Sequence, residues 1–269
     1  MFCQIYDKHV TKACIAVLTR GYKTNKEYET LCKRNKSIEI NLIDKEIDIL
    51  IFHEGNITIE QQSYISNHTP LLHIIFIDIS PIAFKKEKEQ IKFSVETRGI
   101  PINYRHMCSF WFVDFWNVVK DYDFLLRIDE DCVMDCNIDT IFSQLHTYLF
   151  VAGHYENDQD FVTRGLNDFT RSFIEKNKHQ YTFTETKPKQ VAGPYTNVIG
   201  FSLIELRKNN ILMKYIQEVD SSTLIYERRW GDLPIWGEVI YYICGTHTLL
   251  LDSYITYFHG SHHKQINTK

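Results

Sequence analysis

Phe124-Leu-Leu-Arg-Ile-Asp-Glu-Asp131 is a short apolar run that ends abruptly in three acidic residues. The apolar half is typical of a strand enclosed on both faces of a sheet, and ligands collect at the carboxyl ends of strands in open α/β sheets. Because side chains alternate along a strand, Asp129 and Asp131 could face one ion together. Hard oxygen ligands favour Mg²⁺ or Mn²⁺, which usually also bind substrate phosphates. The run therefore indicates either a metal site or a solvated acidic turn after a buried strand.

Other apolar runs precede this one, and segments able to form helices separate them. The alternation predicts an α/β fold with a mostly parallel central sheet flanked by helices. Gly21 and Gly55 follow the first two runs, where the chain must turn at the ligand-binding edge. The strands predicted for the first half are Cys14–Thr19, Ile47–Phe52, Leu71–Ile77 and Phe124–Ile128.

The second half is less regular. Residues 104–120 have apolar side chains at helical spacing, which predicts a helix with one buried face. Between Gly153 and Gly193 the pattern becomes polar, and we expect a long irregular segment there, such as a lid or a binding loop. Asp232 and Pro234 fit the start of a helix, which would leave Glu227 on the loop before it. We also predict a helix from Asn137, strands near 148–152, 197–203 and 248–252, and a helix near 212–219.

Composition narrows the class of protein. The chain has 269 residues, 44% of them hydrophobic, and we expect one domain over residues 1–269. The net charge of −4 argues against a nucleic-acid partner, whose binding surface is usually basic. We find no apolar run near the roughly 20 residues that span a bilayer and no signal peptide. Seven irregularly spaced cysteines cannot all pair, so we expect reduced thiols in a cytoplasmic protein.

Histidines near the end of the chain could add a nitrogen ligand to the metal. His259, His262 and His263 would do so if the C-terminal strand returned to the acidic edge, although histidines in a polar tail are more often only exposed. Cys132 and Cys136 have no second pair nearby to complete a zinc site, and we interpret them as packing residues.

Glu227 lies among aromatic and basic residues. Its carboxylate could stabilise positive charge at an anomeric carbon or act as a nucleophile toward it. An ion pair with Arg228 or Arg229 is the alternative, and those arginines could instead bind phosphate oxygens. A metal on Asp129 and Asp131 would neutralise the departing diphosphate of a nucleoside-diphosphate sugar.

Three motifs occur in order: Tyr104-Arg-His-Met-Cys108, Asp129-Glu-Asp131 and Tyr226-Glu-Arg-Arg-Trp-Gly-Asp-Leu-Pro234. In order and spacing they resemble the yeast-type α-1,2-mannosyltransferases, the glycolipid and glycoprotein mannosyltransferases of the Golgi. The first and third motifs are specific, and the acidic one is generic. The resemblance covers roughly residues 100–260. It implies a GT-A glycosyltransferase fold, a nucleotide-sugar donor, Mn²⁺ and transfer with retention of anomeric configuration.

The resemblance also implies roles for single residues. Asp129 and Asp131 fall on the family's E-P-D metal motif, and His259 matches the late histidine that completes the metal site. The catalytic group would contain Tyr104, which matches a tyrosine lining the donor site. Its other members would be Glu227, which matches the glutamate facing the anomeric carbon, and Asn197, which matches the asparagine of an S-N-F-E-I segment.

The chain also departs from the family. The E-P-D triplet is D-E-D here, which shortens the first carboxylate by one methylene, and Ile199 replaces the glutamate of S-N-F-E-I. Where the family's Y-E-R-W-G-D motif has one arginine, this chain has two, Arg228 and Arg229. The family's membrane anchor is missing, so we expect a cytoplasmic relative, such as one from a bacterium or a large virus.

The sequence thus predicts a retaining, Mn²⁺- or Mg²⁺-dependent glycosyltransferase that uses GDP-mannose or a UDP-sugar and a glycan or other hydroxyl acceptor. The nucleotide-binding part would cover approximately residues 12–135 and the acceptor-side part approximately 136–269. A metal-dependent phosphoesterase or nucleotide-sugar hydrolase could use the same carboxylates on water, and an inactive carbohydrate-binding relative is the non-enzyme alternative. The residues predicted to bind the donor are Thr19, Arg20, Gly21, Tyr104, Arg105 and Asp129.

Overall fold

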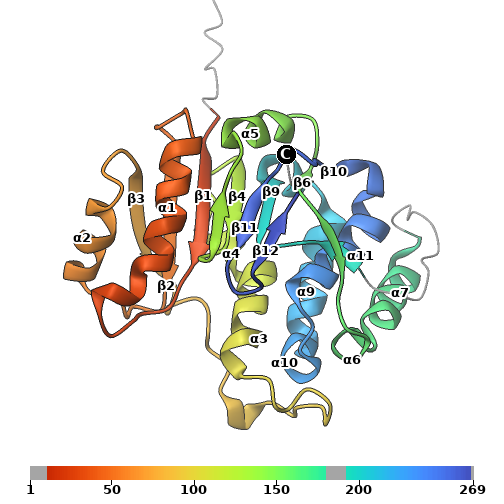
Figure 1. Ribbon diagram of the computed structural model, residues 1–269. Coiled ribbons are helices and arrows are strands. Elements are labelled where there is room, and N and C mark those ends of the chain that lie inside the picture. The colour runs from red at the N-terminus through yellow and green to blue at the C-terminus, as the bar shows by residue number, and fades with distance from the viewer. Residues whose placement is uncertain (1–10, 180–191, 268–269) are drawn as a thin grey trace, which may run out of the picture.

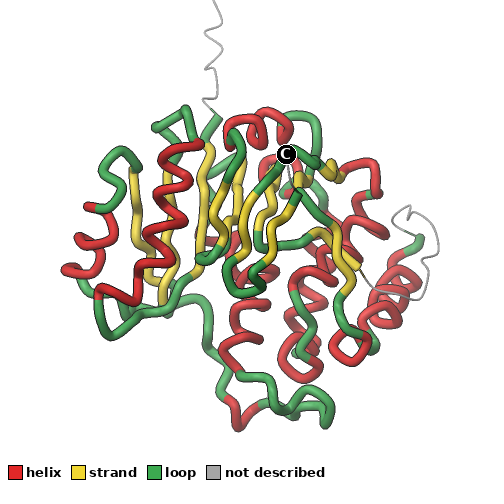
Figure 2. The backbone as a smooth tube through the Cα atoms, viewed as in Figure 1, coloured by secondary structure: helices red, strands yellow, loops and turns green. Residues whose placement is uncertain are grey.

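A computed structural model describes residues 11–179 and 192–267. At its centre lies a sheet of seven strands, drawn in yellow in Figure 2, with the order β10-β6-β9-β4-β1-β2-β3 (Figure 1). Only β9 is antiparallel to its neighbours, so the predicted mostly parallel sheet is confirmed. The strands are β1 (Ala13–Leu18), β2 (Asp48–His53), β3 (His73–Asp78), β4 (Phe124–Ile128), β6 (Phe150–Ala152), β9 (Val198–Ser202) and β10 (Leu249–Leu251).

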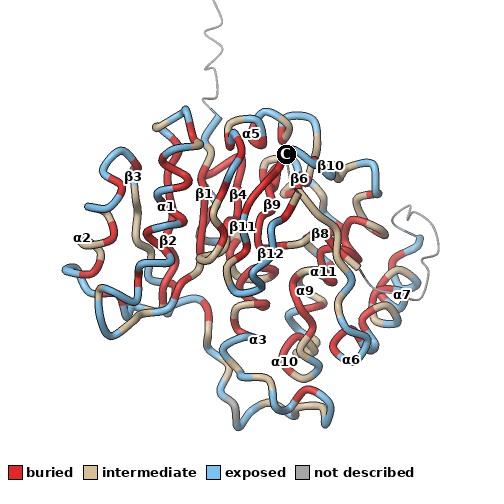
Figure 3. Tube along the Cα trace, viewed as in Figure 1, coloured by how far each residue is buried: buried red, intermediate tan, exposed pale blue. Residues whose placement is uncertain are grey.

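The strands β2 and β4 are buried along their whole length because both faces of the sheet are covered, as the red tube in Figure 3 shows, and most of their residues are apolar. Along β1, Ile15 and Val17 pack on the face covered by α1 (Glu29–Asn41) and α2 (Ile59–Asn67). Cys14 and Ala16 point to the opposite face and join the larger core cluster. The alternation of side chains therefore divides each strand between two cores.

An aromatic helix leads into the acidic strand. α3 (Ile102–Ser109), the π-helical turn η3 (Phe110–Asp114) and α4 (Phe115–Val118) follow one another without interruption, which confirms the helix predicted over residues 104–120. The wide π turn buries three consecutive aromatic residues, Phe110, Trp111 and Phe112. Trp236 of α11 (Asp232–Glu238) packs on Phe112 with ring centroids 5.0 Å apart, so this helix forms the centre of the core.

The region expected to be irregular, from Gly153 to Gly193, is largely ordered into short elements. The prediction was wrong because the polar residues of this region lie on exposed faces of amphipathic helices, while Leu166 and Phe173 are buried. Part of the region, residues 180–191, lies outside the described residues. The elements are β7 (Tyr155–Asn157), α6 (Asp160–Thr163), α7 (Leu166–Asn177) and β8 (Ala192–Pro194), of which β7 and β8 pair with each other.

A second, three-stranded sheet brings the end of the described chain back to the acidic edge. β5 (Cys132–Met134), β11 (Tyr257–His259) and β12 (Lys264–Ile266) are antiparallel in the order β12-β11-β5. His259 lies directly opposite Cys132 in this pairing. The return of the C-terminal strand, on which the histidine ligands depended, is therefore confirmed (Figure 1).

The remaining helices complete the fold. Asn137 caps α5 (Ile138–Leu145) by accepting from the Asp139 backbone N–H at 2.9 Å, as predicted. The helix predicted near 212–219 is α9 (Asn210–Ser222). The other helical elements are η1 (Asn25–Tyr28), η2 (Lys88–Gln90), α8 (Leu203–Leu206), α10 (Leu224–Arg228), η4 (Val239–Cys244) and η5 (Thr246–Thr248).

Two further features concern membrane-spanning helices and cysteine pairing. Within the described ranges, no helix combines the length and the apolar character needed to cross a membrane. Among the described residues, the cysteines at positions 14, 32, 108, 132 and 244 form no disulfide.

Candidate active site

The acidic triplet lies on a tight turn between β4 and β5. Strand β4 ends at Ile128, and the Asp129 carbonyl accepts from the Cys132 N–H at 3.1 Å, which reverses the chain. Alternation along a strand therefore does not apply to Asp129 and Asp131, which we had expected to face one ion. Instead, the three carboxylates point to three different sets of partners.

Asp129 is held by an arginine from its own strand. Arg127 Nε and Nη2 donate to the two Asp129 carboxylate oxygens at 2.8 and 3.1 Å, and Arg127 Nη1 donates to Asp232. The Arg127 guanidinium also lies 4.5 Å from the centroid of the Trp111 ring. Burial raises the pKa of Asp129, and the charge of Arg127 opposes that rise. Both oxygens of Asp129 are therefore already occupied, and its predicted role as a metal ligand stays a prediction.

Glu130 faces the end of β1. The Thr19 hydroxyl donates to Glu130 Oε2 at 2.6 Å, and the Tyr22 hydroxyl donates to Oε1 at 2.8 Å. The Arg20 guanidinium stacks 5.0 Å from the Tyr22 ring centroid. Glu130 thus contacts Thr19 directly and Arg20 through Tyr22, and both Thr19 and Arg20 were predicted to bind the nucleotide.

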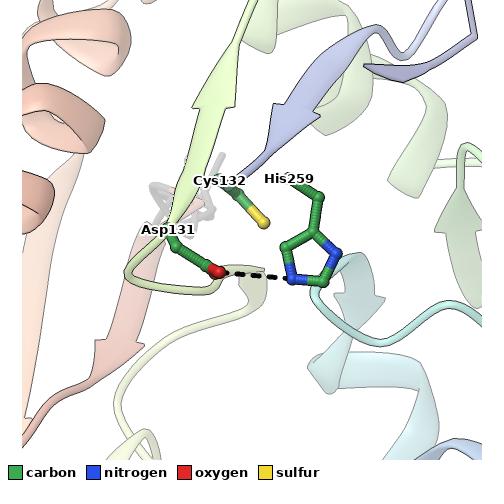
Figure 4. Close-up of side chains that lie close together, drawn as sticks. All are labelled: Asp131, Cys132 and His259. Carbon is green, nitrogen blue, oxygen red and sulfur yellow. Dashed lines mark ion pairs between the residues drawn. The ribbon is translucent and has the colours of Figure 1, made fainter. Parts of the chain in front are cut away.

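Asp131 faces the C-terminal histidine (Figure 4). Its Oδ2 lies 3.4 Å from His259 Nε2 and accepts from the Ser261 backbone N–H at 2.8 Å. Burial opposes ionisation of Asp131, but the bonds from Ser261 and the charge of His259 hold its pKa below the usual value. Burial also lowers the pKa of His259, which favours the neutral imidazole that binds metals.

Two cavities meet at these acidic residues. One, of about 460 Å³, lies at the ends of β1 and β2, and the other, of about 640 Å³, lies between β11, β7 and α11. Both are lined by Met107, Asp129 and Asp131, so the two cavities adjoin at these carboxylates, and we call them together the groove. The first cavity is also lined by Thr19, Arg20, Tyr22, Glu54, Phe84 and Asn103.

The second cavity contains two of the residues predicted to be catalytic. Tyr104 lines it, with the Arg229 guanidinium 4.5 Å from its ring centroid. Asn197 also lines it; its Oδ1 accepts from Tyr257 at 2.8 Å, whereas its buried Nδ2 has no partner among the described residues. A buried donor without a partner is uncommon in folded proteins.

Glu227 does not line either cavity. It belongs to α10 instead of the loop before α11, and Thr223 Oγ1 donates to its carboxylate at 2.8 Å. The expected cap differs as well, because Gly231 is the N-cap of α11 while Asp232 is its first residue and binds Arg127. Its predicted role at the anomeric carbon stays a prediction.

Two of the residues predicted to bind the donor lie away from the cavities. Arg105 is fully buried, and its guanidinium donates to the carbonyls of Thr97 and Tyr226. Arg105 follows Tyr104 on α3 and therefore points to another side of the helix. Its predicted contact with the donor stays a prediction. Gly21 instead allows a close approach of two loops, since a Cβ there would lie 2.3 Å from the Asn56 carbonyl oxygen.

Sequence reasoning missed three residues of the site. Arg127 is a charge inside an otherwise apolar strand, and this break in the pattern was the available signal. The Tyr195 hydroxyl lies 3.0 Å from His259 Nδ1 and 2.7 Å from His262 Nδ1. Tyr195 and Ser261 had no signal of this kind, because they reach the site through the pairing of distant segments.

The side chains of Asp131 and His259 at the middle of the groove are suitable ligands for a divalent cation. A carboxylate oxygen and an imidazole nitrogen 3.4 Å apart are chemically suitable ligands, and both side chains border a cavity wide enough for phosphate and water. The His262 ring lies beside His259, with the two ring centroids 4.5 Å apart.

Curated proteins of similar sequence come from yeasts. Glycolipid 2-alpha-mannosyltransferase 1 of Candida albicans is 28% identical over 163 residues, which are 55% of this chain. Probable mannosyltransferase KTR3 of Saccharomyces cerevisiae is 26% identical over 153 residues, or 51% of this chain. The chain is a relative of the yeast mannosyltransferases. The match spans 37% of the length of each of these two proteins, and no family model matches the chain.

Solved structures show the fold of this mannosyltransferase relative. Mannosyltransferase Ktr4p of Saccharomyces cerevisiae superposes with a TM-score of 0.77 at 17% identity, covering 93% of this chain and 70% of that one. Core-mannan synthase A of Aspergillus fumigatus, in an Mn/GDP form, gives 0.74 at 16% identity over 93% and 74% of the two chains. The predicted GT-A glycosyltransferase fold is therefore confirmed.

Proposed function

We propose that this chain is a metal-dependent glycosyltransferase that moves a sugar from a nucleoside-diphosphate donor to a hydroxyl acceptor with retention of configuration. The observation that carries the proposal is the pair Asp131 and His259, which face each other where the two cavities meet. The names of the yeast relatives and the Mn/GDP form of a structural neighbour favour GDP-mannose over a UDP-sugar as the donor.

The two cavities suit the two halves of such a donor. The first cavity lies at the carboxyl ends of β1 and β2, where open α/β sheets bind nucleotides, and would take the nucleoside against Thr19 and Arg20. The second, with Tyr104 and Asn197 in its wall, would take the sugar and the acceptor. The diphosphate would then lie between the cavities, beside Asp131.

Transfer breaks the bond between the anomeric carbon and a diphosphate oxygen and forms a bond from that carbon to the acceptor oxygen, while the acceptor hydroxyl loses its proton to the departing diphosphate. A divalent ion, when bound by Asp131 and His259, would supply positive charge that stabilises the departing diphosphate. Arg229 adds a fixed cation to the same groove, because the Asp158 carboxylate accepts from it at 3.1 Å and the Tyr104 ring covers it. Asn197 lines the cavity in which the sugar would lie.

The proposal is tested by the melting temperature of the chain with GDP-sugars and UDP-sugars, with and without Mn²⁺. A ligand at one hundred times its Kd stabilises the folded state by about 2.7 kcal/mol, which corresponds to a shift of about 5 °C or more for a chain of this size. We expect the shift only when Mn²⁺ is present, and we expect Asp131→Ala to lose it. Asp121→Ala, at an exposed aspartate before β4, is the matched control. No shift with any nucleotide sugar would remove the basis of the proposal.

A further inference from the structure

A cysteine sulfur lies beside the two proposed metal ligands. Single ligand atoms of Asp131, Cys132 and His259 all lie within 4.8 Å of one another. Figure 4 shows the Cys132 sulfur pointing into the gap between the carboxylate and the imidazole. We propose that Cys132 is a third protein ligand and that the site is selective for a thiophilic divalent ion, Zn²⁺ above all. The inference rests on the proposed function, because both use Asp131 and His259.

The backbone fixes this arrangement. Cys132 begins β5 and lies opposite His259 of β11, and residues opposite each other in an antiparallel pair project from the same face with Cβ atoms about 5 Å apart. The Gly260 N–H donates to the Asp131 carbonyl at 2.9 Å, which ties the turn to the end of β11. Cys132 is fully buried within the sheet, so the ligands are placed before any ion binds.

The ligand types suit a tetrahedral ion. Zinc takes thiolate, imidazole and carboxylate ligands at 2.0 to 2.3 Å, which places neighbouring ligand atoms about 3.5 Å apart. Asp131 Oδ2 and His259 Nε2 already lie 3.4 Å apart, and the sulfur, which lies within 4.8 Å of a ligand atom of each, must move closer when an ion binds. Three protein ligands leave a fourth position open toward the larger cavity, which Asp131 and His259 both line. A donor phosphate oxygen or a water would complete the coordination.

Sulfur changes which ion the site prefers. Oxygen ligands suit Mg²⁺ and Mn²⁺, whereas a thiolate favours Zn²⁺ and other soft ions, and Zn²⁺ also stands above Mn²⁺ in the general order of affinities. On binding, the thiol gives its proton to solvent and the sulfur forms a bond to the ion. We therefore expect Zn²⁺ to displace Mn²⁺ from this site.

Cobalt is the probe, because a thiolate bound to Co²⁺ gives a charge-transfer absorption in the near ultraviolet that oxygen and nitrogen ligands do not give. The full chain titrated with Co²⁺ should develop this absorption, and one equivalent of Zn²⁺ should abolish it. Cys132→Ser should lose the absorption. Cys136→Ser should keep it, since Cys136 is also buried in this region but is not among the three ligands.

Two results would overturn the inference: a wild-type chain without the absorption at saturating Co²⁺, or an absorption that persists in Cys132→Ser. If Cys132→Ser does not fold by circular dichroism, His259→Ala replaces it, and an unchanged absorption in that variant also overturns the inference. The proposed function is tested separately by Mn²⁺-dependent donor binding. If the wild type shows that binding but no cobalt absorption, only the inference about Cys132 fails, whereas the absence of that binding from the wild type would contradict the proposed function itself.

Discussion

Replacing Arg127 with methionine removes the cation that holds two carboxylates beneath the groove. The Arg127 side chain is only 4% exposed and bonds Asp129 through two nitrogens and Asp232 through the third. Methionine fills a similar volume without charge, so the change leaves the packing against Trp111 largely intact. It leaves Asp232, 6% exposed, and Asp129, 30% exposed, without their partner.

The expected loss of unfolding free energy follows from this burial. Removing one partner of a buried ion pair costs about 3–5 kcal/mol. Because Asp129 is partly solvated, we place Arg127→Met near the lower end, at about 3 kcal/mol at pH 7. Loss of the cation–π contact with Trp111 adds about 1 kcal/mol. A total of about 4 kcal/mol is a large share of a typical unfolding free energy, but it leaves a folded chain to measure.

The loss should depend on pH with a definite sign. The pKa of Asp129 is already raised by burial in the presence of Arg127, and removing the cation raises it further. A carboxyl with a raised pKa in the folded state binds more protons folded than unfolded, so stability falls as pH rises through that range. Arg127→Met should therefore lose more stability at pH 8 than at pH 5.

Urea denaturation of wild type and Arg127→Met at both pH values measures these differences. The double variant Arg127→Met/Asp232→Asn should be more stable than Arg127→Met alone, since it removes the stranded charge. A loss below about 1 kcal/mol, or an equal loss at pH 5 and pH 8, would show that Arg127 does not hold the acidic edge together.

Three further variants test single residues. Glu227→Gln should keep turnover within a few-fold, because its carboxylate bonds Thr223 outside both cavities; a loss of several orders of magnitude in kcat would restore the catalytic role implied by the family resemblance. Glu54 borders the first cavity without a partner among the described residues, and burial raises its pKa. Its carboxylate can accept hydrogen bonds from the two N–H groups on the pairing edge of guanine. Glu54→Gln should therefore weaken GDP binding about tenfold or more while leaving UDP little changed in calorimetry. Burial, with the charge of Asp220, raises the pKa of Asp114 to about 7, so Asp114→Asn should remove a fall in melting temperature between about pH 4 and pH 7.

Much of the fold could be predicted because burial on both faces of a parallel sheet leaves a continuous apolar run. β4 was predicted with its observed bounds, and β1 and β2 within one residue at each end. The region around α7 could not be predicted in the same way, because the buried face of that helix is narrow and its polar residues dominate the sequence. The antiparallel direction of β9 likewise depends on pairing with β4 and β6, which local sequence does not record.

At the site, residue types were easier to predict than side-chain directions. The acidic triplet and His259 were placed correctly at one sheet edge because strand order alone brings them together. The directions of the carboxylates could not be predicted, since they depend on the turn closed by Cys132 and on Arg127, both of which act only in the folded chain. The same holds for Cys132, which we interpreted as a packing residue and which lies beside Asp131 and His259.

The most direct measurement is the fate of the sugar when the chain is incubated with Mn²⁺, an isotopically labelled nucleotide sugar and a hydroxyl acceptor. If the chain is a glycosyltransferase, we expect the label to be bound to the acceptor and nucleoside diphosphate to be released. We expect no transfer by Asp131→Ala. Label recovered as sugar phosphate with nucleoside monophosphate would show hydrolysis of the diphosphate linkage and contradict the proposed activity.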